Sequence, residues 1–460
     1  MAPKFGTSGL RGLVTDLTDE VCAAHVAAFL RGVGDGPRQV LVAGDLRPST
    51  ARIMDAVTAG AARAGVAAVD CGRVPTPALA LAAMRAGVPA VMVTGSHIPA
   101  DRNGLKFYTA RGEITKNDEA GILSRLRDDE VSGPAAFADT RDVLSPYLSR
   151  YVDWAGAGAL TGLRIGHYEH SSVARDALGL LLSRLGAEVV PLGRADGFVP
   201  VDTEAVDAAT RARLADWAAA TRLDAIVSTD GDADRPLLTD AAGRVVPGDV
   251  LGPVTARALG AAFVVTPVSS NTLVEAMAVF DGVVRTRIGS PHVIAGMTGA
   301  GGRVVGYEAN GGVLLGFDAE GLAPLPTRDA VLPIVAVLRA ARGHPGGVAG
   351  VVADLPARVT ATDRLQDVPT AVTAGLVADL TARAGSVAAL IGRRGEAARD
   401  LTDGLRVTLQ DGDIVHLRPS GNAPELRVYV ETADADAAAA LLRAMLAAVA
   451  RRLDRIPAGH

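Results

Sequence analysis

The sequence predicts an α/β protein with three similar mixed-sheet α/β domains plus a C-terminal α+β domain around a central cleft. Two observations support this fold class. First, the order strand, polar turn, helix, strand, strand occurs three times along the 460 residues. Second, the last ~100 residues follow another order, with a hairpin and a long alanine-rich helix. With 49% hydrophobic residues, the chain is long enough for several separate cores.

The first repeat begins with an apolar strand at residues 39–43, followed by a Ser/Thr turn. A helix is predicted over 51–64 and a second strand over 66–70. The third strand, 91–93, is apolar throughout and stops at a polar motif that contains Ser96. This alternation of strands with a capped helix is typical of α/β folds.

The second and third repeats follow the same plan. Their helices are expected to end at Leu185 and Val279. Their strands are predicted at residues 163–166, 188–192, 223–228, 263–265, 283–285 and 302–305. In every repeat a polar motif follows the third strand. Because ligand sites in open α/β sheets gather at the carboxyl ends of strands, three loops are expected to face one cleft.

The C-terminal segment predicts a different domain. Residues 405–409 and 414–417 flank the turn Asp411-Gly412, which predicts a hairpin. A further strand is expected at 426–430, and an amphipathic helix at 435–452.

Ser96 and His97 follow the first repeat's third strand, and Lys106 lies in the polar segment beyond them. A serine lifted out of a sheet edge, with an imidazole and a cation beside it, is a candidate nucleophile or phosphoryl carrier. The alternative is an ordinary strand-end turn, which Ser, Asn and Gly also favour.

Asp230, Asp232 and Asp234 follow the second repeat's third strand, and Arg235 comes directly after them. Three crowded carboxylates repel one another unless a cation or protons neutralise them. Oxygen ligands of this kind suit Mg2+. A calcium loop is excluded, because its glycine and glutamate positions hold Arg235 and Ala241. A solvated acidic turn is the alternative.

Glu308 and Asn310 lie among glycines after the third repeat's last strand. Their side chains could bind the vicinal hydroxyls of a sugar, although an ordinary glycine-rich turn has the same composition.

The fourth domain contains a loop with two guanidinium groups, a hydroxyl, an amide and a flexible backbone, which together suit a phosphate. The chain has no match to the nucleotide P-loop spacing. The phosphate-binding candidates are Arg418, Ser420, Gly421, Asn422 and Arg427.

Composition excludes several classes of protein. The net charge of −5, with no basic patch, argues against nucleic acid and membrane surfaces. Aromatic residues make up only 3% of the chain, which argues against stacking platforms for single-stranded nucleic acid. The cysteines, Cys22 and Cys71, have no metal-binding spacing and predict no disulfide framework. No signal peptide or membrane-spanning run is present in the sequence, so a cytoplasmic protein is expected.

Taken together, these motifs resemble the α-D-phosphohexomutase superfamily, and most closely its bacterial phosphomannomutase/phosphoglucomutase branch. Five segments, in the same order as in the family, support the resemblance: Phe5–Gly12, Thr94–Pro99, Asp230–Arg235, Glu308–Gly311 and Arg418–Asn422. The resemblance implies a phosphoserine domain, a metal-binding domain, a sugar-binding domain and a phosphate-binding domain at residues 1–143, 144–245, 246–352 and 353–460.

Several positions depart from the family's pattern, and none removes the serine or an aspartate. The departures are Ile98, Tyr307, Asn310, Asn422 and Ala423. They leave mannose, glucose and glucosamine open as the preferred sugar.

The resemblance implies phosphoryl transfer from phosphorylated Ser96 to a hexose monophosphate, through a bisphosphorylated sugar that turns around before transfer back. It implies Mg2+ held by the three aspartates and the serine phosphate, with Arg235 adding positive charge. Lys106, Arg11 and His97 are the candidates for proton transfer. Glu308, Asn310 and Ser290 are expected to bind the sugar, and the loop of the fourth domain its non-reacting phosphate.

The expected partners are hexose phosphates, with a bisphosphorylated hexose as activator, in a monomer or dimer. Phosphomannomutase activity is predicted first, and phosphoglucomutase or phosphoglucosamine mutase activity is the alternative. Two other classes remain open: a metal-dependent phosphatase and a non-catalytic sugar-phosphate binding protein.

Overall fold

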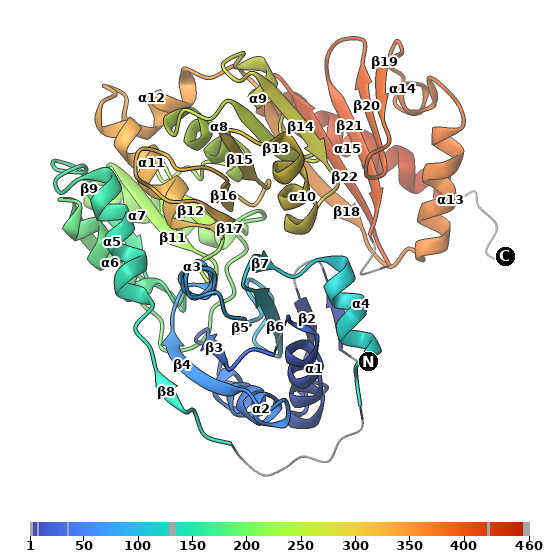
Figure 1. Cartoon of the computed structure of the whole chain (residues 1–460). Coiled ribbons are helices and arrows are strands. Elements are labelled where there is room, and N and C mark those ends of the chain that lie inside the picture. The colour runs from blue at the N-terminus through green and yellow to red at the C-terminus, as the bar shows by residue number, and fades with distance from the viewer. Residues whose placement is uncertain (1–2, 7–8, 35, 128–134, 421–423, 454–460) are drawn as a thin grey trace. The chain divides into compact units, whose positions relative to one another are not determined.

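The structure, a computed structural model, describes residues 3–6, 9–34, 36–127, 135–420 and 424–453 (Figure 1). It divides into two compact units. The first unit comprises Met1–Val265 and Gly289–Val352, and the second comprises Thr266–Ile288 and Ala353–His460. The described strands form three mixed sheets and one antiparallel sheet, which confirms the predicted fold class.

The first sheet has the order β1-β2-β6-β5-β3-β4-β8, with β7 paired to β6. Helices α1 and α2 cover one face and α3 contacts the other (Figure 1). Central strands β3 and β5 are apolar and parallel, as expected of strands covered on both faces. The elements are β1 (Lys4–Gly6), β2 (Gly9–Leu13), α1 (Asp19–Gly32), β3 (Gln39–Gly44), α2 (Thr50–Arg63), β4 (Ala67–Arg73), α3 (Thr76–Ala86), β5 (Ala90–Val93), β6 (Arg102–Thr109), β7 (Gly112–Glu113), α4 (Lys116–Ser124) and β8 (Asp139–Thr140).

The second sheet has the order β10-β9-β11-β12, in which only β12 is antiparallel to its neighbour. Its third strand, β11, is wholly buried and leads into the aspartate loop. The elements are α5 (Leu144–Ala155), β9 (Arg164–Tyr168), α6 (Arg175–Arg184), β10 (Glu188–Leu192), α7 (Ala208–Thr221), β11 (Ala225–Thr229) and β12 (Pro236–Leu238).

The third sheet has the order β14-β13-β15-β16-β17. The chain passes from the first unit into the second within β13 and returns before α10. The elements are α8 (Gly248–Ala258), β13 (Phe263–Pro267), α9 (Leu273–Ala276), β14 (Gly282–Thr286), α10 (Ser290–Ala300), β15 (Val304–Tyr307), β16 (Val313–Leu315), β17 (Leu325–Asp329), α11 (Val331–Arg342) and α12 (Gly347–Ala353).

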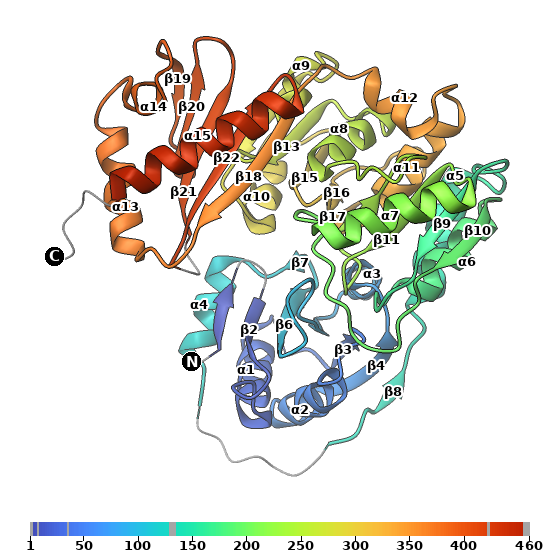
Figure 2. The ribbon, with the colours of Figure 1, turned by 180° about the vertical axis from the view of Figure 1, so that it is seen from behind.

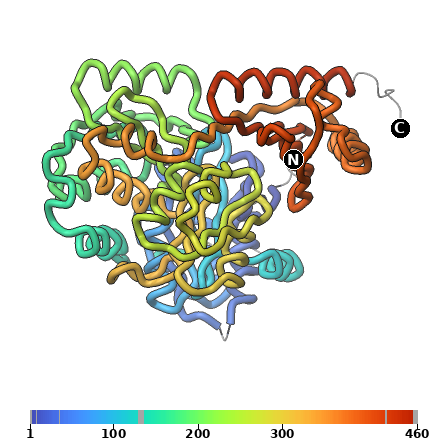
Figure 3. Tube along the Cα trace, turned by 90° about the horizontal axis from the view of Figure 1, so that it is seen from above, coloured from blue at the N-terminus to red at the C-terminus, as the bar shows by residue number. Residues whose placement is uncertain are grey.

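The fourth sheet lies in the second unit and is antiparallel throughout, with the order β18-β22-β21-β20-β19. The long helix α15 packs along β18 and β22, as Figure 2 shows, and its path can be followed in Figure 3. The elements are β18 (Val359–Leu365), α13 (Thr370–Thr381), α14 (Ser386–Leu390), β19 (Glu396–Asp400), β20 (Leu405–Leu409), β21 (Ile414–Pro419), β22 (Leu426–Thr432) and α15 (Ala435–Leu453).

The predicted strands and the C-terminal hairpin are confirmed, with ends that differ by at most three residues. One helix prediction is wrong in length. The helix expected to end at Val279 is the single turn α9, Leu273–Ala276. Ala278 has a φ of 52°, a left-handed conformation that stops a helix. Among the described residues, no helix combines the length and the apolar character needed to cross a bilayer.

Two buried histidines in the second sheet's domain predict acid lability. His167 and His170 are at most 1% exposed, and burial lowers the pKa of each to about 4 from an ordinary 6.5. Between pH 4 and pH 6.5 the folded state therefore binds fewer protons than the unfolded state. Stability contributed by the neutral rings is full above pH 6.5 and is lost as the pH falls toward 4.

At pH 5 the free energy of unfolding is expected to be lower by about 2 kcal/mol for each histidine. Urea unfolding at pH 7.5 and pH 5 measures it, with Trp217 as the fluorescent probe, because its ring lies 5.1 Å from that of Tyr168. A Trp154→Phe background leaves Trp217 as the only tryptophan. The variant His167→Gln/His170→Asn should show a smaller pH dependence, and an unchanged dependence would contradict the assignment.

Candidate active site

Three loops of the first unit meet where β5, β11 and β15 end. They contain Ser96, the three aspartates and Glu308, respectively. Ser96 Oγ donates a hydrogen bond to Asp230 Oδ2 at 2.5 Å, so the serine loop and the aspartate loop are in direct contact. Arg328 binds both Asp234 and Glu308, which connects the third loop to the second. The structure thus brings together the three motifs that the sequence places at strand ends.

Ser96 is held in an unusual backbone conformation. Its φ is 55°, in the left-handed region that few non-glycine residues adopt. The sequence predicts a hydroxyl lifted out of the sheet edge, but Ser96 is only 1% exposed. The reason is the aspartate loop, which packs so closely that a Cβ added at Gly231 would lie 2.6 Å from the Ser96 carbonyl oxygen. The hydroxyl points at a carboxylate instead of solvent.

His97 lies between the serine and a guanidinium group. Arg235 Nη1 donates a hydrogen bond to His97 Nδ1 at 3.0 Å. His97 Nδ1 also lies 3.3 Å from Ser96 Oγ. Burial and then the charge of Arg235 lower the pKa of His97 to about 2. A neutral ring that accepts a hydrogen bond from an arginine is a poor proton donor, so this arrangement favours an orienting role for His97.

The aspartate loop forms a buried group of carboxylates. Asp230, Asp232 and Asp234 are each at most 1% exposed, and one oxygen from each lies within 4.8 Å of the others. Asp232 Oδ1 and Asp234 Oδ1 are buried and have no hydrogen-bond partner among the residues that the structure describes. Unsatisfied buried carboxylate oxygens are costly, and a hard cation satisfies them. The three residues therefore fit a divalent metal ion.

Cations surround this group. Lys106 Nζ donates to Asp232 and to Asp234, both at 2.6 Å. Burial alone lowers the pKa of Lys106, but the two carboxylates outweigh it and raise the pKa. Burial and the neighbouring carboxylates raise the pKa of Asp230 well above its usual range. Against the effect of burial, Arg328 and Lys106 hold the pKa of Asp234 below its usual range.

Arg328 belongs to the site although the sequence analysis missed it. It lies in β17 and is 2% exposed. It donates to Asp234 Oδ2 at 2.8 Å and to Glu308 Oε2 at 2.8 Å, and these charges raise its pKa well above the ordinary value against the effect of burial. Nothing in the run Pro326-Thr327-Arg328-Asp329 marks this arginine.

Glu308 and Asn310 form one compact loop. Asn310 Nδ2 lies 3.5 Å from Glu308 Oε2, and Asn310 Oδ1 accepts a hydrogen bond from the Gly312 backbone at 3.0 Å. Both side chains are at most 5% exposed. The asparagine amide therefore shapes the loop that presents the glutamate.

Ser290 is the first residue of α10 and has a partner in the first sheet. It donates to Glu113 Oε2 at 2.6 Å, and Thr327 donates to the other oxygen of Glu113 at 2.8 Å. Glu113 thus connects β7 with α10 and β17, a role that the sequence analysis did not predict.

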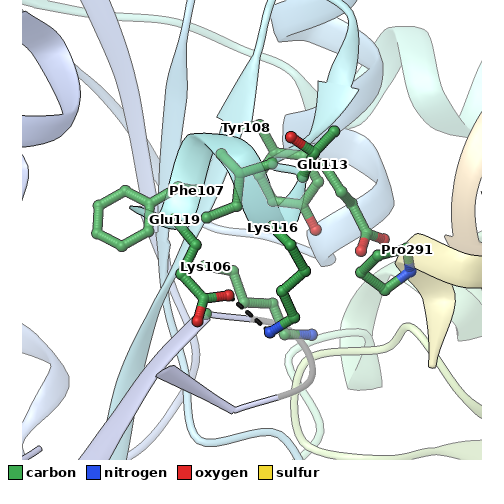
Figure 4. A pocket seen from close by; sticks show the side chains of 10 residues that line it. Lys106, Phe107, Tyr108, Glu113, Lys116, Glu119 and Pro291 are labelled. Carbon is green, nitrogen blue, oxygen red and sulfur yellow. Dashed lines mark hydrogen bonds and ion pairs between the residues drawn. The ribbon is translucent and has the colours of Figure 1, made fainter. Parts of the chain in front are cut away.

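A small surface pocket opens beside these residues (Figure 4). Lys106, Tyr108, Glu113 and Pro291 line it, and an ion pair between Lys116 and Glu119 spans one side. Lys106 also donates a hydrogen bond to Asp232, so this one side chain connects the pocket with the aspartate loop.

Arg11 lies in β2, opposite Gly104 of β6. Burial, followed by the charges of Arg235 and Arg328, lowers its pKa to about 10. Even so, the Arg11 guanidinium stays charged at neutral pH, beside Arg235 and Arg328.

The predicted phosphate loop lies in the second unit, at the end of β21. Arg418 Nε lies 3.0 Å from Asp403 Oδ2, and Asp403 Oδ2 also accepts a hydrogen bond from the Ile288 backbone at 3.0 Å. Ser420 is 3% exposed, and Arg427 donates to Glu425 at 2.9 Å. Gly421 and Asn422 lie outside the described residues.

Known proteins of one family are similar to this chain over nearly its full length. Three domain models of phosphoglucomutase/phosphomannomutase match: domain I at residues 2–131, domain III at 247–359 and the C-terminal domain at 358–448. A phosphomannomutase of Sinorhizobium fredii is 47% identical, covering 97% of this chain and 98% of the relative. A phosphomannomutase of Salmonella muenchen is 42% identical, covering 98% and 96%.

The fold has close counterparts among solved structures. A crystal structure of a phosphoglucomutase/phosphomannomutase family protein from Burkholderia thailandensis superposes with a TM-score of 0.79. It covers 98% of this chain and 97% of that protein at 23% identity. Identity this low makes the likeness one of fold alone.

Proposed function

We propose that this chain, which belongs to the phosphoglucomutase/phosphomannomutase superfamily of phosphohexomutases, is a phosphomannomutase that interconverts mannose 6-phosphate and mannose 1-phosphate. The observation that carries the proposal is the 47% identity, over nearly the full length, to a phosphomannomutase. The contact between Ser96 Oγ and the buried aspartate loop supports it, because it presents a hydroxyl where a metal ion would neutralise a phosphoryl group.

The proposed reaction uses Ser96 as a phosphoryl carrier. The bond between Ser96 Oγ and phosphorus breaks, and a bond forms between phosphorus and a free hydroxyl oxygen of the hexose monophosphate. The sugar hydroxyl gives up its proton to a basic group of the site, and Ser96 Oγ takes up a proton as its bond to phosphorus breaks. The resulting bisphosphate turns around, and its other phosphoryl group returns to Ser96. A bisphosphorylated hexose would also phosphorylate an unmodified Ser96 and so activate the enzyme.

The charged side chains divide this work. Mg2+, held by Asp230, Asp232 and Asp234, would supply positive charge to the oxygens of the transferring group. Lys106 and Arg235 add further positive charge beside the same carboxylates.

Lys106 and Arg11 are the proposed groups for proton transfer at the attacking or leaving oxygen, and His97 orients the serine loop. Glu308, with Asn310 and Ser290, binds the sugar. Arg418, Ser420 and Arg427 bind the non-reacting phosphate, together with Gly421 and Asn422.

Turnover of mannose 1-phosphate, glucose 1-phosphate and glucosamine 1-phosphate, measured side by side, tests the proposal. The highest kcat/KM is expected with mannose 1-phosphate. A higher kcat/KM with glucosamine 1-phosphate would instead assign the chain as a phosphoglucosamine mutase. Release of inorganic phosphate as the main product would favour a phosphatase.

The variant Glu308→Gln tests the sugar loop. It preserves the shape of the side chain and removes the charge that binds Arg328. We expect kcat/KM for mannose 1-phosphate to fall about ten- to a hundredfold, as for loss of a charged hydrogen bond. Phosphorylation of Ser96 by a hexose bisphosphate should fall less. The matched control is Glu320→Gln, an exposed glutamate of the same domain. Equal behaviour of the two variants would contradict the assignment.

A further inference from the structure

Arg47 is a buried arginine three residues beyond the end of β3, and its guanidinium group lies within the serine loop. Its side chain is fully buried. Nη2 donates to the carbonyl oxygens of Ser96, at 2.8 Å, and Ile98, at 2.5 Å. Nη1 donates to those of Pro99, at 2.6 Å, and Arg102, at 3.0 Å. The loop from residue 96 to residue 102 is therefore built around one planar cation.

Asp45 completes the arrangement. Its carboxylate accepts the remaining guanidinium hydrogen bond, from Arg47 Nε at 3.1 Å. It also accepts from the Thr94 hydroxyl at 2.8 Å and from the Gly95 backbone at 3.3 Å. All five N–H groups of the guanidinium thus have acceptors, which a lysine ammonium with three donors cannot reproduce.

Close packing fixes this geometry. A Cβ added at Gly95 would lie 2.6 Å from Arg47 Cζ, so the backbone passes directly over the guanidinium. The ring of Phe198 lies 4.1 Å from the same carbon. The Arg47 side chain therefore cannot adopt another position unless the serine loop moves.

The consequence reaches the serine hydroxyl. Ser96 has a φ of 55°, a conformation that persists only where its surroundings over-determine it. Its carbonyl is bound by Arg47, and its backbone nitrogen donates to Thr94 Oγ1 at 2.8 Å. With both flanking peptide groups held, the Cα–Cβ bond can point only toward Asp230, which the hydroxyl contacts.

We infer that Arg47 is a positioning residue for phosphoryl transfer, which holds the Ser96 backbone so that Oγ faces the aspartate loop. The inference rests on the proposed role of Ser96 as the phosphoryl carrier. Because the Arg47 side chain is fully buried and touches no substrate, its loss should act on kcat and leave KM nearly unchanged.

The test compares Arg47→Lys with Arg399→Lys in the full-length enzyme. Arg399 is a matched control, because it too donates to backbone carbonyls, those of Leu380, Thr381 and Arg383, and pairs with Glu396. Arg47→Lys should lower kcat roughly a hundredfold, the effect of misplacing a reacting group by about 1 Å, with KM within about threefold. Arg399→Lys should lose a similar amount of thermal stability and keep its kcat.

Two further measurements test the inference if Arg47→Lys does not fold properly. Thr94→Val keeps the side-chain shape and removes the hydroxyl that contacts both Asp45 and Ser96, so kcat should fall about tenfold. Added guanidinium ion, below denaturing concentration, should restore part of the kcat of Arg47→Ala, and tetramethylammonium should not.

Several outcomes would overturn the inference. One is an unchanged kcat in both Arg47→Lys and Thr94→Val. Another is a loss of activity in Arg47→Lys and Arg399→Lys that is no larger than the fraction of unfolded enzyme explains. An inactive Ser96→Ala with a fully active Arg47→Lys would overturn this inference alone. A fully active Ser96→Ala would overturn the proposed function as well.

Discussion

Replacing Ser96 with alanine is expected to lower mutase turnover by roughly 10⁴-fold or more, because the covalent carrier of the phosphoryl group is lost. Ser96 Oγ is the hydroxyl that contacts the aspartate loop, at 2.5 Å from Asp230. A coupled assay with mannose 1-phosphate measures turnover, and the intact mass of the wild-type enzyme should show one phosphate that maps to Ser96.

Ser172→Ala is the matched control for this variant. Like Ser96, Ser172 is a buried serine, but it follows the first strand of its repeat, and it hydrogen-bonds Thr229 within the second sheet's domain. It should retain most of the wild-type turnover. Full activity in Ser96→Ala, or a stable phosphate on another residue, would show that the serine has been assigned the wrong role.

Asp232→Asn is expected to lower turnover by about a thousandfold or more, since the developing charge on the transferring group loses its counter-ion. Asp232 is fully buried and accepts hydrogen bonds from Thr76 and Lys106 through one oxygen, while its other oxygen has no hydrogen-bond partner in the described part of the chain. An amide keeps the shape of this side chain and is a weaker metal ligand.

Calorimetric titration with Mg2+ measures the metal site independently of turnover. Asp232→Asn should bind Mg2+ far more weakly than the wild type. Asp240→Asn, at another buried aspartate of the same domain, should bind it normally. If exhaustive chelation leaves wild-type activity undiminished, the aspartate loop is a structural feature and not a metal centre.

The sequence predicts much of this architecture because its strands are short apolar runs that stop at polar motifs. Ser96, Asp230 and Glu308 could all be placed at strand ends in this way, and the structure brings their loops together. The family motifs then predict the chemistry. The domain boundaries and the roles of individual site residues stay predictions.

The residues that the sequence missed act through contacts between distant segments. Arg328 binds Asp234 from 94 residues away, and Glu113 accepts hydrogen bonds from residues 177 and 214 positions later. No local pattern of polarity or spacing records such pairs. Arg47 follows a buried strand in the run Gly44-Asp45-Leu46-Arg47, which resembles a polar turn like many others.

The buried state of Ser96 could not be predicted for a related reason. A strand-end turn is ordinarily at the surface. Here a second loop, with a glycine that allows close approach, covers it. Exposure at such a site depends on the partner loop and not on the serine's own neighbours.

The four carbonyl oxygens bound by Arg47 have a consequence for the evolution and engineering of the enzyme. Every residue type has a backbone carbonyl, so these contacts make no demand on the side chains at positions 98, 99 and 102. Ile98, which departs from the family's usual asparagine, is one substitution that such a framework tolerates. Libraries that randomise Ile98 and Arg102 should therefore yield many active variants. Those that randomise Asp45, Arg47 or Gly95 should yield almost none.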